Sequence, residues 1–122
     1  GRVKNFKKVF DNVEMTFKGS WELIVADFLH DLKIEFTNIL DPIEYIWSED
    51  NKTHLYFPDF YLLKFDKYIE VKGFVRQRDK DKWLHIDREK LIVLYAEDIK
   101  SIKDKTYEIN KIICNDCGYT FI

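Results

Sequence analysis

The side chains best suited to catalysis lie in two short segments of the chain. Residues 57–60 contain Asp59, and residues 68–73 contain Glu70 and Lys72. Oxygen ligands from one or two carboxylates suit Mg²⁺, which keeps water sites open for a phosphate. A lysine beside them could orient a water molecule or stabilise charge that develops on phosphorus. Together the three predict metal-assisted hydrolysis of a phosphodiester, whereas Glu70 and Lys72 alone would predict only an exposed salt bridge worth under about 1 kcal/mol.

Strand geometry would bring two of these residues to one face. Side chains alternate along a strand, so in a strand over residues 68–72 Ile69 and Val71 would face the core. Glu70 and Lys72 would then emerge together on the opposite face. A carboxylate and an ammonium group would thus share one site.

A hairpin would add the second carboxylate. Pro58 cannot donate to a sheet, so it marks a strand start or an edge. A tight antiparallel turn at Asp66 and Lys67 would then place Asp59 opposite the second strand. Two carboxylates and one lysine are predicted to converge.

The elements that must position this site begin with a helix over residues 20–32. Ser20 can cap its exposed amides, and Gly19 lets the chain turn into it. Apolar residues recur along it at steps of three and four, as in an amphipathic helix. These residues are Trp21, Ile24, Val25, Phe28, Leu29 and Leu32.

Alternating and apolar segments predict most of the remaining structure. A buried strand is expected over residues 91–95, because this run is entirely apolar or aromatic. The order of elements predicts an α/β fold, a central mixed β-sheet flanked by helices. The other predicted strands cover 33–38, 43–47, 55–57, 60–65 and 68–72, a turn covers 48–53, and helices cover 79–89 and 96–105.

Basic residues gather in two stretches on either side of the middle of the chain. Residues 1–8 carry four basic side chains and no acid, and residues 72–82 carry five against two aspartates, although the net charge of the chain is −2. Such stretches are either solvated surface or a footprint for a polyanion. Charge alone leaves both interpretations open.

The combined motifs resemble the PD-(D/E)XK nucleases, the restriction-endonuclease-like superfamily. Pro58-Asp59 is followed after ten residues by Glu70-Val71-Lys72, and the segment before the first helix is similar to that of small members from phages and mobile elements. That segment reads Phe17-Lys18-Gly19-Ser20-Trp21-Glu22. The resemblance covers about residues 17–82.

The resemblance implies a role for each matching residue. Asp59 and Glu70 would be metal ligands, as would the main-chain carbonyl of Val71, and Lys72 would be the catalytic lysine. Glu22 would be the helix carboxylate near the metal, although the helix dipole favours a glutamate at that position in any protein. The implied cofactor is Mg²⁺, with Mn²⁺ as a substitute.

Candidate DNA-binding residues lie in and next to the basic stretches. Lys18 stands where related proteins more often carry arginine, which would keep a phosphate contact but lose its bidentate geometry. The residues after the catalytic lysine lie where similar nucleases contact DNA, or else they begin a solvated helix. The full set is Lys7, Lys8, Lys18, Arg76, Gln77, Arg78, Lys80 and Lys82.

Two cysteines near the end of the chain form a Cys-x-x-Cys pair. Cys114 and Cys117 resemble one knuckle of a zinc ribbon, but a full site needs two further ligands, and the three histidines are scattered. We expect a remnant of a zinc site. A site completed by a second subunit, or an oxidised pair, stays open.

Length and composition set the remaining expectations. Residues 1–122 are expected to form a single domain, since no linker-like stretch divides them. No apolar run reaches the roughly 20 residues that span a bilayer, and no secretory signal is evident, so we expect a cytoplasmic protein that does not enter membranes.

The expected function is a metal-dependent DNA endonuclease, of a homing or invasive type carried by a phage or mobile element. Structure-specific cleavage of junctions or damaged DNA would use the same chemistry. A non-catalytic DNA-binding module is the alternative from another class, and RNA as substrate stays open. Cleavage of both strands would need a homodimer or two successive nicks.

Overall fold

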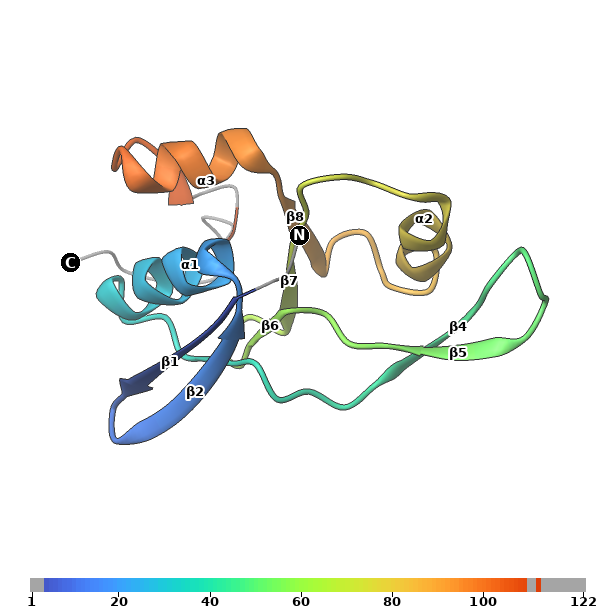
Figure 1. Ribbon diagram of the computed structural model, residues 1–122, viewed down its shortest axis with the longest axis horizontal. Helices are drawn as coiled ribbons and strands as arrows, with labels where there is room; N and C mark the ends of the chain where they lie inside the picture. Colours follow the sequence, from blue (N-terminus) through green and yellow to red (C-terminus); the bar gives the residue numbers. More distant parts are fainter. Residues whose placement is uncertain (1–3, 110–111, 113–122) are drawn as a thin grey trace.

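The computed structural model describes residues 4–109 and residue 112. Two strands precede the first helix, and most of the other strands follow it before the second helix (Figure 1). In chain order they are β1 (Asn5–Phe10), β2 (Val13–Lys18), α1 (Ser20–Asp31), β3 (Phe36–Thr37), β4 (Ile43–Ile46), β5 (Thr53–Tyr56), β6 (Phe60–Leu62), β7 (Lys67–Val71), α2 (Gln77–Trp83), β8 (Leu91–Leu94) and α3 (Ala96–Lys103).

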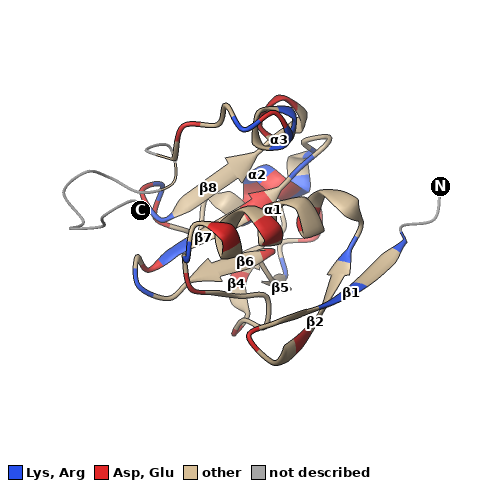
Figure 2. Cartoon of the chain, turned by 90° about the vertical axis from the view of Figure 1, so that its left-hand side faces the viewer, with Lys and Arg blue, Asp and Glu red and all other residues tan. Residues whose placement is uncertain are grey.

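A mixed four-stranded sheet forms the centre of the fold. Its strand order is β3-β6-β7-β8, with antiparallel pairs except for the parallel pair β7 and β8. Figures 1 and 2 show α1 and α3 on one face of this sheet and α2 on the opposite side. The predicted α/β class with a central mixed sheet is therefore confirmed.

The core lies where α1 meets the sheet. Val25, Ala26 and Leu29 of the helix are fully buried, and so are Phe60 of β6 and Ile69 of β7. They belong to one apolar cluster, as expected when a helix buries its apolar stripe on a sheet. This packing holds the beginning of α1 near the β6 and β7 strands.

A hairpin of β1 and β2 precedes α1, where the sequence interpretation assigned no structure. Its turn residues Asp11 and Asn12 have φ angles of 47° and 68°, a left-handed conformation that these two residue types tolerate better than most. Phe10 and Phe17 point from the hairpin into the core. The first basic stretch is thus largely a strand.

The strands β4 and β5 form a separate antiparallel hairpin, which we call the arm. It extends away from the central sheet in Figure 1, with α2 beside it. Tyr45 of β4 and Tyr56 of β5 are buried. Since α2 contacts β4, the helix and the arm form a second packed unit next to the sheet.

Several predicted details were wrong. Ser20 does not cap α1: the capping position is Gly19, with a φ of 98° and no side-chain hydrogen bond. The predicted strand 33–38 shortens to Phe36–Thr37, because Lys33 has a φ of 59° where the chain leaves the helix. The strand β8 is only partly buried apart from Leu94, since it carries a parallel partner on one side only.

The β6–β7 connection also differs from the prediction. Leu62 pairs with Lys67, so residues 63–66 form the loop in place of a two-residue turn at Asp66 and Lys67. The second helix covers Gln77–Trp83, not 79–89. Among the described residues, no helix is long and apolar enough to cross a membrane.

Candidate active site

The β6–β7 hairpin brings Asp59 beside the carboxylate-bearing strand, as predicted. Phe60 pairs with Ile69, so the preceding Asp59 lies opposite Glu70 at the same end of the two strands. The backbone N–H of Val71 donates to Asp59 Oδ2 at 2.7 Å. One oxygen of Asp59 is therefore fixed by β7.

Glu70 is buried, which the alternation of the strand did not predict. Only 7% of its surface is exposed, and Ile69 beside it is also fully buried, so both faces of β7 are covered at this point. The hydroxyl group of Tyr56 donates to Glu70 Oε2. The arm therefore supplies both the cover and the hydrogen-bond partner of this carboxyl group.

Glu22 lies in the first turn of α1 and approaches Asp59 from the helix side. Burial raises the pKa of Glu22 from its ordinary value of 4.5 to about 8, and the charge of Asp59 and a hydrogen bond with its carboxyl group add to this rise. The positive charge of Lys18 acts in the opposite direction. The sequence grouped Glu22 with Asp59, and the structure brings them together.

The other two carboxyl groups are perturbed in the same sense. Burial, followed by the charge of Asp59, raises the pKa of Glu70 to about 8. Burial also raises the pKa of Asp59, although the amide of Val71 and the charge of Lys72 oppose it. Three acids that each hold their proton more tightly than usual form a cluster that a cation would relieve.

Lys72 is turned toward a residue that the sequence interpretation did not include. Its Nζ lies 2.9 Å from Oδ1 of Asp79 on α2, and Lys82 Nζ lies 3.8 Å from the same oxygen. The side chain of Lys72 is 24% exposed. The ammonium group thus sits at the border of the carboxylate cluster, held by α2.

The cluster offers oxygen atoms to a divalent cation, but its geometry is not yet that of a metal site. Asp59 and Glu70 each accept a hydrogen bond from another part of the protein on one oxygen. Asp59 also shares hydrogen bonds with the carboxyl groups of Glu22 and Glu70, which a cation would have to replace. In the part of the chain that the structure describes, no three His, Cys, Asp or Glu side chains form a group ready to hold an ion. A cation would have to draw Glu22, Asp59 and Glu70 closer together.

A pocket opens beside the cluster. It has a volume of about 410 Å³, and both Glu22 and Val71 line it. Lys4 and Lys18 lie on its rim together with Trp21. This pocket is the space next to the carboxylates that a ligand could enter.

The N-terminal candidates for DNA binding differ in how freely they can act. Lys7 and Lys18 are exposed. Lys8, in contrast, forms an ion pair with Asp27 of α1, so its charge is already compensated. Figure 2 shows basic positions on β1 and acidic ones along α1, hence this side of the molecule is not uniformly positive.

The candidates on α2 divide in the same way. Arg76 and Lys80 are exposed. Arg78 donates through Nε to the hydroxyl group of Tyr45 at 2.6 Å, and its guanidinium group lies 4.3 Å from the centre of the Trp47 ring. Arg78 is also exposed, but its guanidinium group is engaged with the arm.

Gln77 and Lys82 also make contacts inside the protein. Gln77 Nε2 donates to Asp81 Oδ1 at 3.2 Å. Lys82 Nζ lies 5.2 Å from the centre of the Tyr56 ring, in addition to its contact with Asp79. These two side chains therefore have partners inside the protein, and their predicted contacts with DNA stay predictions.

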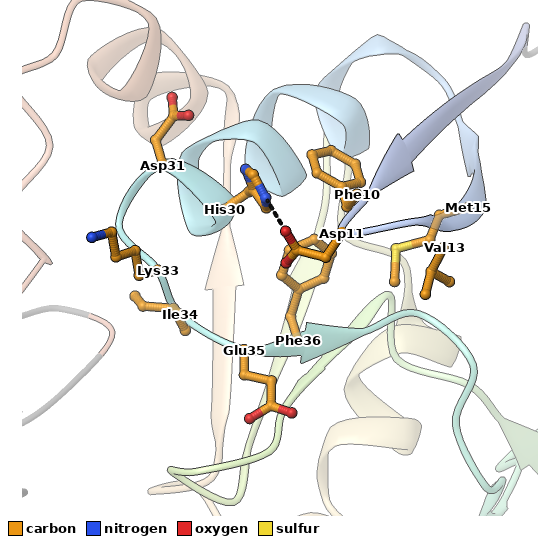
Figure 3. Close-up of a pocket in the computed structure, with 10 residues that line it drawn as sticks. All are labelled: Phe10, Asp11, Val13, Met15, His30, Asp31, Lys33, Ile34, Glu35 and Phe36. Carbon is orange, nitrogen blue, oxygen red and sulfur yellow. Dashed lines mark hydrogen bonds and ion pairs between the residues drawn. The ribbon is translucent and has the colours of Figure 1, made fainter.

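A larger pocket lies elsewhere, at the end of the β1–β2 hairpin (Figure 3). Its volume is about 590 Å³, and His30 Nε2 lies 3.3 Å from Asp11 Oδ1 at its rim. None of the predicted site residues lines it. The carboxylate cluster is therefore the candidate active site because of its chemistry, although the larger pocket lies elsewhere.

Two residues of the site were missed by the sequence interpretation. Tyr56 lies on β5 close before Asp59, and Asp79 lies among the basic residues of α2. Both become relevant only because the arm and α2 fold over β7. Cys114 and Cys117 lie outside the described residues, so their predicted role stays a prediction.

Comparisons with protein-family models, with curated proteins and with solved structures gave no match. The functional argument therefore depends on the residues of the site.

Proposed function

We propose that this protein is a metal-dependent DNA endonuclease that hydrolyses phosphodiester bonds. The observation that carries the proposal is the meeting of Glu22 of α1, Asp59 just before β6 and Glu70 of β7, with the ammonium group of Lys72 at their border. Their shared burial raises all three carboxyl pKa values. Such a strained cluster is typical of a functional site rather than of a structural ion pair.

The proposed cofactor is Mg²⁺, which Mn²⁺ could replace. When bound, the ion would polarise a phosphoryl oxygen and lower the pKa of a coordinated water. Glu22, Asp59, Glu70 and the carbonyl group of Val71 would hold it. The carboxyl oxygens not bound to Tyr56 or Val71 are the available donors.

Lys72 would act on the substrate. As an ammonium group it can donate a hydrogen bond to the scissile phosphate and stabilise the negative charge that grows on it. Glu70 is buried and Asp59 is half-buried, so the ion would mediate their contact with the nucleic acid. The proposal thus assigns the phosphate to Lys72 and the ion to the acids.

DNA is the proposed partner, with the exposed Lys7, Lys18, Arg76 and Lys80 as candidate phosphate contacts. The motif resemblance favours a homing or invasive endonuclease, with cleavage of junctions or damaged DNA as the alternative. Because residues 4–109 offer one such cluster, cutting both strands would need a homodimer or two nicks. Binding without cleavage would favour the non-catalytic module.

The test is cleavage of supercoiled, linear, branched and single-stranded DNA with Mg²⁺, Mn²⁺ or EDTA. We expect cutting only with a divalent ion, and its loss in both Lys72→Gln and Glu70→Gln. These two variants keep a hydrogen-bond group for Asp79 and Tyr56, so the buried partners are not left unpaired. Lys67→Gln, on the same strand but at its other end, is the matched control.

Circular dichroism and thermal unfolding would show that each variant is folded. Undiminished cutting by either purified site variant would refute the assignment. An equal loss of cleavage in the Lys67→Gln control would show that the strand tolerates no substitution. The loss in the two site variants would then not identify catalytic residues.

A further inference from the structure

Two different elements hold Lys72, one at its main chain and one at its ammonium group. Its backbone N–H donates to the carbonyl oxygen of Leu94 in β8 at 2.9 Å. Its Nζ lies 2.9 Å from Asp79 Oδ1 on α2. A lysine has a long flexible stem, so an unrestrained ammonium group would sample many positions. In this protein the lysine side chain extends from the sheet to α2, and its direction is fixed by these two contacts.

Asp79 is well suited to act as the fixed end. It is only 3% exposed, and its Oδ2 accepts the backbone N–H of Arg76 at 2.9 Å, at the beginning of α2. Burial opposes its ionisation, but the Arg76 amide and the Lys72 ammonium outweigh burial and lower the pKa of Asp79 below its usual range. The carboxylate is therefore charged, buried and oriented.

Tertiary contacts set the place of α2 and hence of Asp79. Asp81 accepts the backbone N–H of Ser48 at 3.1 Å and its hydroxyl group at 2.8 Å, at the end of the arm. Arg78 joins the same helix to Tyr45 in the middle of the arm. The arm, α2 and Lys72 are thus connected by a continuous series of polar contacts.

Without Asp79, Lys72 would still be attracted by Asp59 and Glu70 of the candidate metal site. Both Asp59 and Glu70 already feel its positive charge, which lowers their pKa values against the effect of burial. An ammonium group released from α2 would move onto those oxygens and compete with a cation for them. Asp79 therefore keeps the ammonium group of Lys72 near Asp59 and Glu70 without letting it bind their oxygens.

We propose that Asp79 is the positioning residue for Lys72: its buried carboxylate holds the ammonium group at the border of the Asp59–Glu70 pair, aimed at the place of a phosphate. This inference rests on the proposed function. It also assigns a purpose to the arm, which orients the lysine through α2.

The first experiment needs no variant and no nuclease activity. Lys72 and Lys82 are equally exposed, with side-chain exposures of 24% and 23%, but their Nζ atoms lie 2.9 and 3.8 Å from Asp79. Limited acetylation with acetic anhydride, read by mass spectrometry, should therefore modify Lys72 several-fold more slowly than Lys82, because a charge-assisted hydrogen bond restrains the nitrogen. Equal rates would overturn the proposal.

The second experiment compares Asp79→Asn with Asp81→Asn. Both aspartates are buried on α2, but only Asp79 contacts Lys72. The amide oxygen of an asparagine at 81 can still accept both hydrogen bonds from Ser48, so Asp81→Asn removes a charge and keeps the contact between α2 and the arm. An asparagine at 79 can still accept the Arg76 amide, so the start of the helix is kept while the charge is lost. In Asp79→Asn, acetylation of Lys72 should rise several-fold toward that of the exposed Lys80, and in Asp81→Asn it should stay at the wild-type rate.

Cleavage kinetics provide the functional readout. A displaced catalytic group typically slows the chemical step about 10- to 100-fold, so Asp79→Asn should lower kcat by this factor and leave KM for DNA within about twofold. Asp79→Glu, which keeps the charge on a longer side chain, should recover part of kcat. Asp81→Asn should keep the wild-type kcat.

The outcomes separate the two proposals. Unchanged Lys72 acetylation in Asp79→Asn, or an equal loss of kcat in Asp81→Asn, would overturn the positioning role. If the wild type cuts no DNA while Lys72 acetylation still rises in Asp79→Asn, the restraint stands and the proposed function fails.

Discussion

Replacing Glu70 by glutamine should change the pH dependence of stability in EDTA. Burial, and then the charge of Asp59, raises the pKa of Glu70 from 4.5 to about 8. A carboxyl group whose pKa rises on folding binds its proton more tightly in the folded state. Its contribution to stability is therefore fully present below about pH 4.5 and is lost as the pH rises through about 8. Glutamine cannot ionise, so the variant should escape this loss.

The size of the effect follows from the pKa values. Each pKa unit corresponds to about 1.4 kcal/mol, so the rise from 4.5 to about 8 sets an upper bound of about 5 kcal/mol on the loss. The actual loss should be smaller than this bound. Glu22 and Asp59 share the electrostatic repulsion, and water that enters the folded protein weakens it. We expect Glu70→Gln to gain on the order of 2–4 kcal/mol over the wild type across this pH range.

Urea unfolding in EDTA, followed by tryptophan fluorescence, would measure the difference at each pH. Glu44→Gln is the matched control, because Glu44 is an exposed glutamate on β4 and should follow the wild type at every pH. If the free-energy difference between Glu70→Gln and the wild type did not change with pH, the burial of an ionisable Glu70 would be refuted. The same result would remove the cause given for the strained cluster.

Two further predictions concern the ion and the nucleic acid. Saturating Mn²⁺ should stabilise the wild type by RT ln(1 + [L]/Kd), on the order of 1–3 kcal/mol at ten- to hundredfold excess over Kd, and Asp59→Asn should lose most of that gain in thermal unfolding. An equal gain in both proteins would exclude Asp59 as a principal ligand. Neutralising the exposed Arg76 and Lys80 together should lower the slope of log DNA affinity against log salt by about 2, measured by fluorescence anisotropy in EDTA. Arg78→Gln should change this slope less, because Arg78 is engaged with Tyr45, and identical slopes in all variants would exclude α2 as a phosphate-binding element.

Local sequence patterns predicted the elements that carry their own signal. The apolar stripe of α1 and the apolar run of β8 were located to within a few residues, because periodicity directly reflects which side of an element is buried. The convergence of Asp59 with Glu70 was also predictable, since two adjacent strands in a hairpin leave few possible registers.

Other features were missed or wrongly predicted, for identifiable physical reasons. The β1–β2 hairpin was overlooked because its lysines suggested a solvated segment, although Phe6, Met15 and Phe17 alternate with polar residues as in a strand. The predicted cap at Ser20 was wrong because a glycine with a positive φ already turns the chain into the helix. The residue that caps α1 depends on the path of the preceding β1–β2 hairpin.

The sequence by itself determined the residue types and the order of elements from α1 onward, and so the candidate set of Glu22, Asp59, Glu70 and Lys72. Only the tertiary structure decided that Glu70 is buried against Tyr56 and that Lys72 pairs with Asp79. Neither partner could be read from spacing, since Tyr56 and Asp79 lie on other elements whose approach to β7 depends on tertiary packing. Burial and charge pairing act over a few ångströms whatever the separation in sequence, and here they set the pKa values of the three carboxyl groups and the direction of the Lys72 side chain.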